Sequence, residues 1–220
     1  FLGEEITVVG GRIEIVRKPE VRESGGVVPT PRYIVDAILV RPLLPALSGK
    51  DPESLREFYV ADICCGSGIF LLSAYEFILD YYLNWYLENN PSEHIGQKIY
   101  EVCAGKWRLT FEEKRRILQD HIRGVDIDAN AVEVAKFSLQ LKLIEDETGN
   151  DLREYVSRQR SRALPDLNGI IRSGNSLVSQ PEWIIAMHDP KPKKIINKVN
   201  PFNWSAEFTT EMECGGFNVI

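Results

Sequence analysis

Residues 57–70 read EFYVADICCGSGIF, and they contain the clearest strand-turn-helix signal of the chain. Its first half is an apolar run of strand length, and Gly66, Ser67 and Gly68 follow it as a tight turn. A long apolar helix is expected next, from about Ser67 to about Glu88. Glycines at such a turn let a ligand approach the backbone, and the N-terminus of the helix offers unpaired N–H groups. The loop therefore reads as a ligand-binding loop or as a plain tight turn.

The spacing within this loop argues against two common ligands. A dinucleotide-binding loop has a third glycine three residues after the second, and Leu71 stands at that position. A phosphate-binding loop needs a Gly-Lys-Ser/Thr sequence, which does not follow Gly66. An oxidoreductase that binds a nicotinamide dinucleotide is therefore disfavoured.

The strand-to-helix unit recurs further along the chain. The sequence IRGVDI at 122–127 predicts a second strand, and Asp128 is predicted to cap the helix that follows it. The sequence GIIRSGNSL at 169–177 predicts a third strand, and FNVI at 217–220 predicts a fourth. This alternation predicts an α/β fold with a mainly parallel sheet, helices on both faces and right-handed crossovers. In such sheets ligands bind beyond the carboxyl ends of the strands.

The segments that precede this sheet carry signals of their own. Residues 6–16 hold two β-rich runs around a Gly-Gly pair, which predicts an N-terminal β-hairpin. Thr30 is predicted to cap a helix that has Pro31 at its first position. Pro42 and Pro45 are expected to end that helix.

The crossover between the first two strands is long. In dinucleotide folds an acidic residue lies about 20 residues after the glycines, whereas Asp126 lies much further from Gly68. A helical insertion is therefore expected within the crossover. Thr110 and Glu113 have the spacing of a capping box and predict the start of a helix there.

Two polar residues follow the second and third strands. Asp126 ends its strand, where a carboxylate can accept two hydrogen bonds from a ribose diol, whereas helix capping explains Asp128 instead. Asn175 carries an amide that donates and accepts at once, as an adenine edge requires, although asparagine is also a common turn residue. With a backbone loop suited to a carboxylate, these groups match adenosine joined to an amino acid. S-adenosylmethionine fits that description.

The composition sets limits on partners and metals. The formal net charge is −6, whereas a chain that binds nucleic acid by phosphate contacts alone is expected to have an excess of basic residues. Any DNA contact is therefore expected to be local or to lie outside this chain. The four cysteines have no zinc-site spacing, and no metal is expected. The cysteines are interpreted as reduced, which predicts a cytoplasmic location. Polar residues interrupt the most apolar segment, 69–87, so no membrane span is expected.

Four motifs, in order, resemble those of the adenine-N6 DNA methyltransferases of the type IIG restriction-modification group. The family's D-P-A-C-G-S-G loop stands here as residues 62–68, with Ile63-Cys64 in place of Pro-Ala. Its G-V-D-I-D motif is 124–128, and its G-[DN]-S-L motif is 174–177. Its upstream Y-T-P motif is reduced to Thr30-Pro31 because Pro29 replaces the tyrosine. The resemblance implies a Rossmann-like S-adenosylmethionine-dependent methyltransferase fold, truncated, over 29–220, after a hairpin and connector at 1–28.

The resemblance also implies roles for individual residues. The methionine part of the cofactor is expected at the upstream motif and the glycine loop, the ribose at the second motif and the adenine at the third. In chain order the implied cofactor-binding residues are Thr30, Pro31, Asp62, Cys64, Gly66, Ser67, Gly68, Asp126, Ile127, Asn175 and Ser176. The family's catalytic Asn/Asp-Pro-Pro-aromatic segment has no counterpart, so no catalytic residue is assigned. Asn200-Pro201-Phe202 imitates it without the second proline and is predicted to be a turn.

The resemblance implies the S-adenosylmethionine-binding part of an enzyme that methylates adenine at N6 in a restriction-modification system. The chain is expected to be a segment of a longer protein, to bind the cofactor without catalysing, and to meet double-stranded DNA mostly through regions outside it. The alternative is a methyltransferase-like module without catalysis, used for binding or assembly. The altered upstream motif and the missing catalytic segment motivate that alternative.

Overall fold

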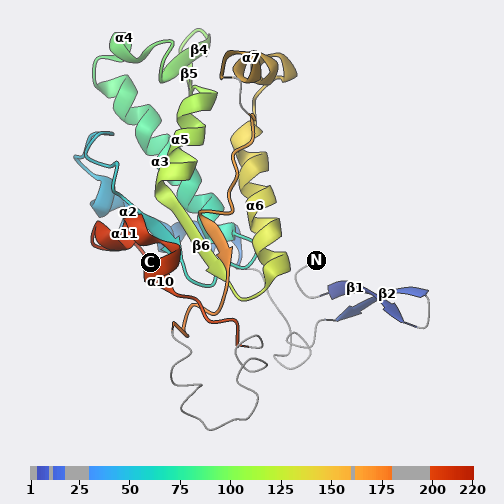
Figure 1. Cartoon of the computed structure of the whole chain (residues 1–220). Helices are drawn as coiled ribbons and strands as arrows, with labels where there is room; N and C mark the ends of the chain where they lie inside the picture. Colours follow the sequence, from blue (N-terminus) through green and yellow to red (C-terminus); the bar gives the residue numbers. More distant parts are fainter. Residues whose placement is uncertain (1–3, 10–11, 18–29, 160–161, 180–198) are drawn as a thin grey trace.

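A computed structural model describes residues 4–9, 12–17, 30–159, 162–179 and 199–220. Its centre is a parallel three-stranded sheet in the order β3-β6-β7 (Figure 1). The strands are β3 (Val60–Asp62), β6 (Ile122–Asp126) and β7 (Ile171–Ser173). The protein is therefore a mixed α/β structure, and all three strands present their carboxyl ends at one edge.

Residues 217–220 extend this sheet beyond β3. Val219 forms a parallel bridge with Val60, and the amide of Ala61 donates to the carbonyl of Val219 at 2.9 Å. The amide of Asn218 donates to the carbonyl of Tyr59 at 2.9 Å. The segment lies where a fourth strand was predicted, but it forms a single bridge rather than a strand. The spatial order is thus β7, β6, β3 and then residues 217–220.

Alternation along β6 shows that both faces of the sheet are covered. A β-carbon added to Gly124 would meet Leu71 of helix α3 (Ile69–Glu88) at 2.7 Å. The neighbours of Gly124 point the other way: Val125 packs with Phe208, and Arg123 pairs with Glu211. These two partners lie beside or within the short helices α10 (Trp204–Glu207) and α11 (Thr209–Glu213). Successive strand residues thus face α3 and the α10–α11 segment in turn.

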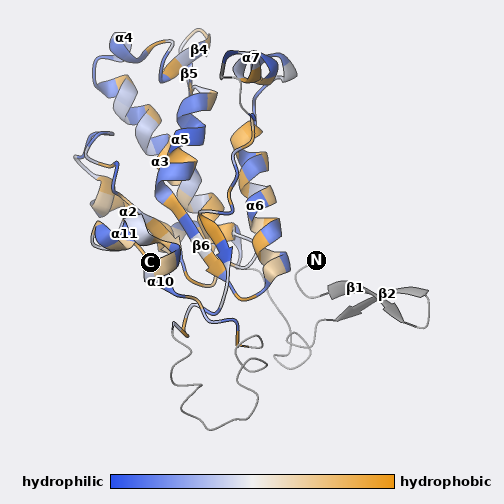
Figure 2. Ribbon diagram, viewed as in Figure 1, coloured by the Kyte–Doolittle hydropathy of each residue, from blue (hydrophilic) through white to orange (hydrophobic). Residues whose placement is uncertain are grey.

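Helix α6 (Ala129–Ile144) follows the second strand and begins as predicted. The Asp128 carboxylate accepts the amide of Asn130 at 2.9 Å, so Asp128 is its N-cap. The expected apolar face is buried, and it consists of Val132, Ala135, Leu139 and Leu143. Figure 2 shows hydrophobic and hydrophilic residues alternating along α6. The inward row packs into the core that α6 shares with α3 and the sheet.

Helix α2 (Arg32–Leu47) corrects two expectations. Its N-cap is Pro31, with no side-chain capping bond, so Thr30 is not the cap and Pro31 is not the first helical residue. Pro42 and Pro45 lie inside the helix rather than ending it. A buried row at four-residue spacing explains why the helix continues, because packing offsets the lost backbone hydrogen bonds. That row is Val35, Leu39, Leu43 and Leu47.

The crossover insertion is only partly helical. After the short helix α4 (Pro91–His94) it forms an antiparallel hairpin of β4 (Ile99–Cys103) and β5 (Lys106–Leu109). The predicted helix follows as α5 (Phe111–His121), which leads directly into β6. Periodicity missed the hairpin because its strands are short.

The capping box of α5 is half formed. The hydroxyl of Thr110 accepts the amide of Glu113 at 3.3 Å. The Glu113 side chain does not return the bond, because it binds other side chains, and the amide of Thr110 donates instead to the carbonyl of Lys98 at 2.8 Å. Tertiary contacts thus replaced the local one.

The chain also forms a helix after α6 and a strand pair near its N-terminus. Helix α7 (Gly149–Gln159) was not predicted, although Thr148 and Asp151 form a reciprocal cap at its start that the sequence T-x-x-D signals. In the N-terminal segment β1 (Glu4–Val9) and β2 (Arg12–Arg17) pair antiparallel, with Val9 opposite Arg12.

Candidate functional site

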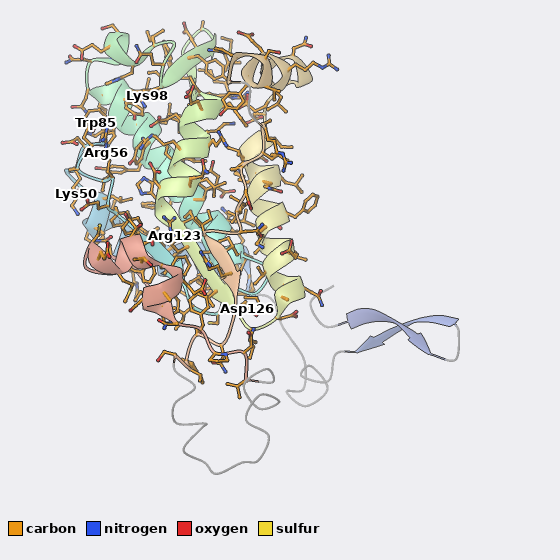
Figure 3. All side chains as sticks on the ribbon, in the orientation of Figure 1. Lys50, Arg56, Trp85, Lys98, Arg123 and Asp126 are labelled. Atoms are coloured by element: carbon orange, nitrogen blue, oxygen red, sulfur yellow. The ribbon has the colours of Figure 1, made fainter. Side chains whose placement is uncertain are left out.

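Backbone hydrogen bonds join the loops that follow the three strands. The amide of Cys65 donates to the carbonyl of Val125 at 3.0 Å, and the amide of Gly66 donates to the Asp126 carboxylate at 2.8 Å. The amide of Gly174 donates to the carbonyl of Asp126 at 2.9 Å. Asp126 therefore links the loop after β3 to the loop after β7, at the carboxyl edge of the sheet (Figure 3).

A cavity of about 590 Å³ opens beside the loop after β3. Its polar end contains five of the predicted cofactor residues, namely Thr30, Asp62, Cys64, Gly66 and Ser67. Its apolar lining, which we call the apolar wall, comes from α2, the first turns of α3 and the segment beside β3. The cavity is within the range of about 300–1,000 Å³ that is usual for small-molecule sites.

The two glycines of the loop are required for different reasons. Gly66 has a φ of +53°, and no atom lies within 4 Å of the place where its β-carbon would stand. Gly68 has a φ of +86°, and its β-carbon would meet Ala135 of α6 at 3.0 Å. Gly66 therefore leaves open space beside the cavity, whereas Gly68 lets the start of α3 pack closely against α6.

Asp62 gives the polar end of the cavity an acidic character. Its carboxylate accepts the amide of Cys64 at 3.1 Å. Burial, and then the nearby charge of Asp126, raise the pKa of Asp62 above its ordinary value. Burial, followed by the charges of these two aspartates, also raises the pKa of the Cys64 thiol. A cationic group bound here would relieve the repulsion between the two carboxylates.

The Asp126 carboxylate already accepts two backbone hydrogen bonds. One oxygen accepts the amide of Gly66 at 2.8 Å, and the other accepts the amide of Asp128 at 2.8 Å. A carboxylate has about four lone-pair positions, so each oxygen retains capacity for a ligand hydroxyl. Asp126 thus both shapes the glycine loop and presents acceptors at the sheet edge.

The predicted residues after β6 and β7 lie outside this cavity. The Asn175 side-chain oxygen accepts the amide of Leu177 at 3.2 Å, which is the turn that its residue type favours. Its amide nitrogen is the group suited to donate to a purine. Ile127 is 58% exposed, and Ser176 is half-buried beside Asn175.

Thr30 and Pro31 are separated by the structure. Thr30 lines the cavity, whereas Pro31 is an exposed N-cap outside it. Pro29, which stands where the family has tyrosine, lies outside the described residues.

The apolar wall of the cavity was not predicted from the sequence. Ile38 and Pro42 lie one helical turn apart on α2, and Phe70 lies in the first turn of α3. Val219 and Ile220 complete the wall. The four-residue spacing on α2 was a usable signal, but the contribution of residues 219–220 depends on strand order.

Phe202 belongs to a structural cluster rather than to the cavity. It is 3% exposed and packs with Phe208 and Trp204. Asn200 adopts a left-handed conformation with a φ of +48°, and Pro201 bridges Asn175. Residues 200–202 thus form a bridge to the loop after β7 rather than an assigned turn. The ring of Phe202 is buried and is not available to stack on a base.

Among the described residues, no three His, Cys, Asp or Glu side chains are grouped so as to hold a metal ion. The four cysteines are unbridged, with Cys65 buried and the other three exposed. No helix in the described part of the chain has the length and apolar character needed to cross a bilayer.

The fold and the site define a class: a mixed α/β protein with a small-molecule cavity at the carboxyl edge of a parallel sheet. Residues 120–220 match the Eco57I restriction-modification methylase family. The chain is 33% identical, over 204 residues, to the type II restriction enzyme and methyltransferase RM.Eco57I of Escherichia coli. It is 32% identical, over 132 residues, to a Methanocaldococcus jannaschii protein named as a type II restriction enzyme and methyltransferase, RM.MjaORFECS2P.

These matches confirm the resemblance to methyltransferases of restriction-modification systems. The first covers 92% of this chain and 19% of its relative, and the second covers 60% of this chain and 9% of its relative. The chain thus spans less than a fifth of the length of these relatives.

Proposed function

We propose that this chain is the S-adenosylmethionine-binding part of a DNA methyltransferase that methylates adenine at N6 in a restriction-modification system. The observation that carries the proposal is the contact between the glycine loop and Asp126, where the amide of Gly66 donates to the carboxylate at 2.8 Å. This contact joins the cavity beside β3 to the end of β6. A ligand with an amino acid at one end and a ribose at the other fits that arrangement.

The chemistry of the cavity fits the cofactor. S-adenosylmethionine carries two positive charges, on its ammonium and its sulfonium, and both are attracted to Asp62 and Asp126. Its carboxylate suits the N-terminus of α3, where Gly68 is the N-cap. The methylene groups of its methionine chain suit the apolar wall formed by Ile38, Phe70 and their neighbours. When bound, the cofactor supplies an electrophilic methyl group.

The strand order supports a Rossmann-like fold. Doubly wound sheets place their first four strands in the order 3-2-1-4 and bind ligands where the order reverses, beside the first strand. Here the order is β7, β6, β3 and residues 217–220. The cavity lies beside β3 and Val219, which is that point of reversal.

The substrate and the setting rest on the motifs and the relatives. Adenine N6 is proposed because the four motifs stand in the order of the adenine-specific group. Double-stranded DNA is proposed as the partner because the relatives are named as restriction enzymes and methyltransferases. A DNA-modifying enzyme of this kind acts in the cytoplasm.

Calorimetry with S-adenosylmethionine tests cofactor binding. The variant is Asp126→Asn, and the matched control is Asp128→Asn, which makes the same change two residues away and retains a good helix cap. We expect the unchanged chain to bind, and Asp126→Asn to weaken binding about tenfold or more, because it loses charge-assisted hydrogen bonds. Asp128→Asn should bind within about twofold of the unchanged chain. No binding by the unchanged chain, or equal binding by both variants, would contradict the assignment and favour a module without catalysis.

Nucleoside analysis tests the base. The protein that carries these residues is incubated with double-stranded DNA and S-adenosylmethionine labelled in the methyl group, and the DNA is then hydrolysed to nucleosides. We expect the label in N6-methyladenine. Label in a methylated cytosine would overturn the adenine assignment and leave cofactor binding intact.

A further inference from the structure

Residues 200–204 form hydrogen bonds with the loop after β7. The amide of Asn175 donates to the carbonyl of Asn200 at 2.6 Å, and the amide of Phe202 donates to the carbonyl of Val178 at 2.8 Å. The indole N–H of Trp204 donates to the carbonyl of Ser176 at 3.0 Å. These three bonds reach successive parts of the segment 174–178, which we call the adenine loop.

Side-chain packing reinforces these bonds. A β-carbon on Gly174 would stand 2.7 Å from the ring of Phe202, so the loop and that ring are in close contact. The Trp204 ring packs against Phe202 with ring centroids 4.9 Å apart and stacks on Phe208 at 5.7 Å. Trp204 thus has a fixed orientation, and its N–H points at the loop rather than into solvent.

We infer that Trp204 is a positioning residue that holds the adenine loop in the geometry in which Asn175 meets the cofactor. This inference rests on the proposed function. Other bonds hold the two ends of the loop: the amide of Gly174 donates to the carbonyl of Asp126 at 2.9 Å, and Asn175 accepts the amides of Val178 and Leu177 within the loop itself. The indole of Trp204 adds a side-chain hydrogen bond from another segment at the middle of the loop, the carbonyl of Ser176. A loop that is ordered before binding loses less entropy when the ligand arrives.

The direct test is Trp204→Phe, which keeps an aromatic ring in the cluster and removes the indole donor together with part of the ring volume. The control is Trp85→Phe, the same change on α3 far from Asp126 (Figure 3), where the ring contacts Tyr86 and His94. We expect Trp204→Phe to weaken S-adenosylmethionine binding by about threefold to tenfold, the range that follows from losing one hydrogen bond. Trp85→Phe should leave the affinity unchanged.

Two readouts separate positioning from a general loss of structure. Hydrogen exchange in the ligand-free chain should rise in residues 174–178 for Trp204→Phe and not elsewhere, while the melting temperature stays close to that of the unchanged chain. The affinity for 5′-methylthioadenosine, which contains the adenosine half, should fall by the same factor as the affinity for S-adenosylmethionine.

Two substitutions of Asn200 test the inference independently through the backbone. Asn200→Gly preserves the left-handed conformation, whereas Asn200→Val makes it strongly unfavourable and displaces the carbonyl that Asn175 uses. We expect Asn200→Gly to bind as the unchanged chain does and Asn200→Val to bind more weakly. Binding by Trp204→Phe equal to that of the unchanged chain would overturn the inference. Absence of binding by the unchanged chain would overturn the proposed function instead, so the two failures are distinct.

Discussion

The two ends of helix α3 are held in different ways. At its N-terminus the chain is fixed by backbone groups: the amide of Gly66 binds Asp126, and Gly68 packs on Ala135. Near its C-terminus it is fixed by buried side chains, among them Tyr86 and Glu113, whose hydroxyl and carboxylate lie 2.7 Å apart. The first end borders the cavity in which we propose that the cofactor binds, whereas the second end is held by a buried side-chain network. Changes at the two ends should therefore separate binding from stability.

The side-chain network centres on Glu113. This residue is 2% exposed and accepts hydrogen bonds from Tyr86 at 2.7 Å and from Lys98 at 2.8 Å. Arg116 also pairs with it. Burial alone would raise the pKa of Glu113, but the bonds from Arg116, Lys98 and Tyr86 lower it below its ordinary value. The network ties α3 and α5 to the hairpin β4–β5.

The largest predicted effect is on this network. Glu113→Ala leaves Arg116 and Lys98 without their shared partner and Tyr86 without an acceptor. We expect the free energy of unfolding to fall by about 3 kcal/mol, as for other broken buried ion pairs. Denaturant titration measures this loss, and calorimetry below the unfolding transition should find S-adenosylmethionine affinity unchanged. A loss of affinity in the folded variant would show that the two ends are coupled.

A buried histidine predicts a pH effect at the same end. His121 is fully buried; its Nδ1 lies 2.7 Å from the carbonyl of Phe58 and its Nε2 lies 2.9 Å from the hydroxyl of Tyr82. The carbonyl can only accept, so Nδ1 carries the proton and Nε2 accepts from the tyrosine, which requires a neutral ring. Burial lowers the pKa of His121 to about 4, against the bond to Phe58, which favours the charged form.

The sign follows from this shift. The unfolded chain binds a proton at His121 near its ordinary pKa of about 6.5, and the folded chain does so only near pH 4. Stability is therefore full above about pH 6.5 and falls as the pH drops towards 4, by up to about 3 kcal/mol. Unfolding curves at several pH values measure the loss. In His121→Leu this part of the slope should vanish, and an unchanged slope would contradict the assignment.

A substitution in the glycine loop beside the cavity should lower stability least of the three changes. It should weaken S-adenosylmethionine binding most. Gly66→Ala places a side chain at a φ of +53°, where there is room for it. We expect stability to fall by about 1–2 kcal/mol from backbone strain. S-adenosylmethionine binding should weaken about tenfold or more, because the methyl group enters space beside the cavity and the strain displaces an amide that binds Asp126. Calorimetry and thermal melting measure both, and Gly105→Ala, an exposed hairpin glycine with a φ of +79°, is the control for strain alone.

Local sequence was sufficient for elements whose signals are themselves local. The Asp128 cap, the start of α5 at Thr110 and the inward row of α6 depend on residues within a few positions of one another. The glycine loop belongs here too, because positive φ angles at Gly66 and Gly68 follow from a strand that turns at once into a helix. The resemblance to methyltransferases rests on such short motifs.

Tertiary structure decided what depends on distant partners. Pro42 and Pro45 remain inside α2 because a buried row of leucines and valine holds the helix against α3, a contact that no local pattern contains. The carboxylate of Glu113 accepts hydrogen bonds from Tyr86 and Lys98 instead of completing the predicted capping box. The apolar wall of the cavity includes residues 219–220 beside β3, and the loop at 174–178 accepts a hydrogen bond from the indole of Trp204. Backbone conformation is set mainly by neighbours in sequence, whereas burial and hydrogen-bond partners are set by the packing of segments far apart in the chain.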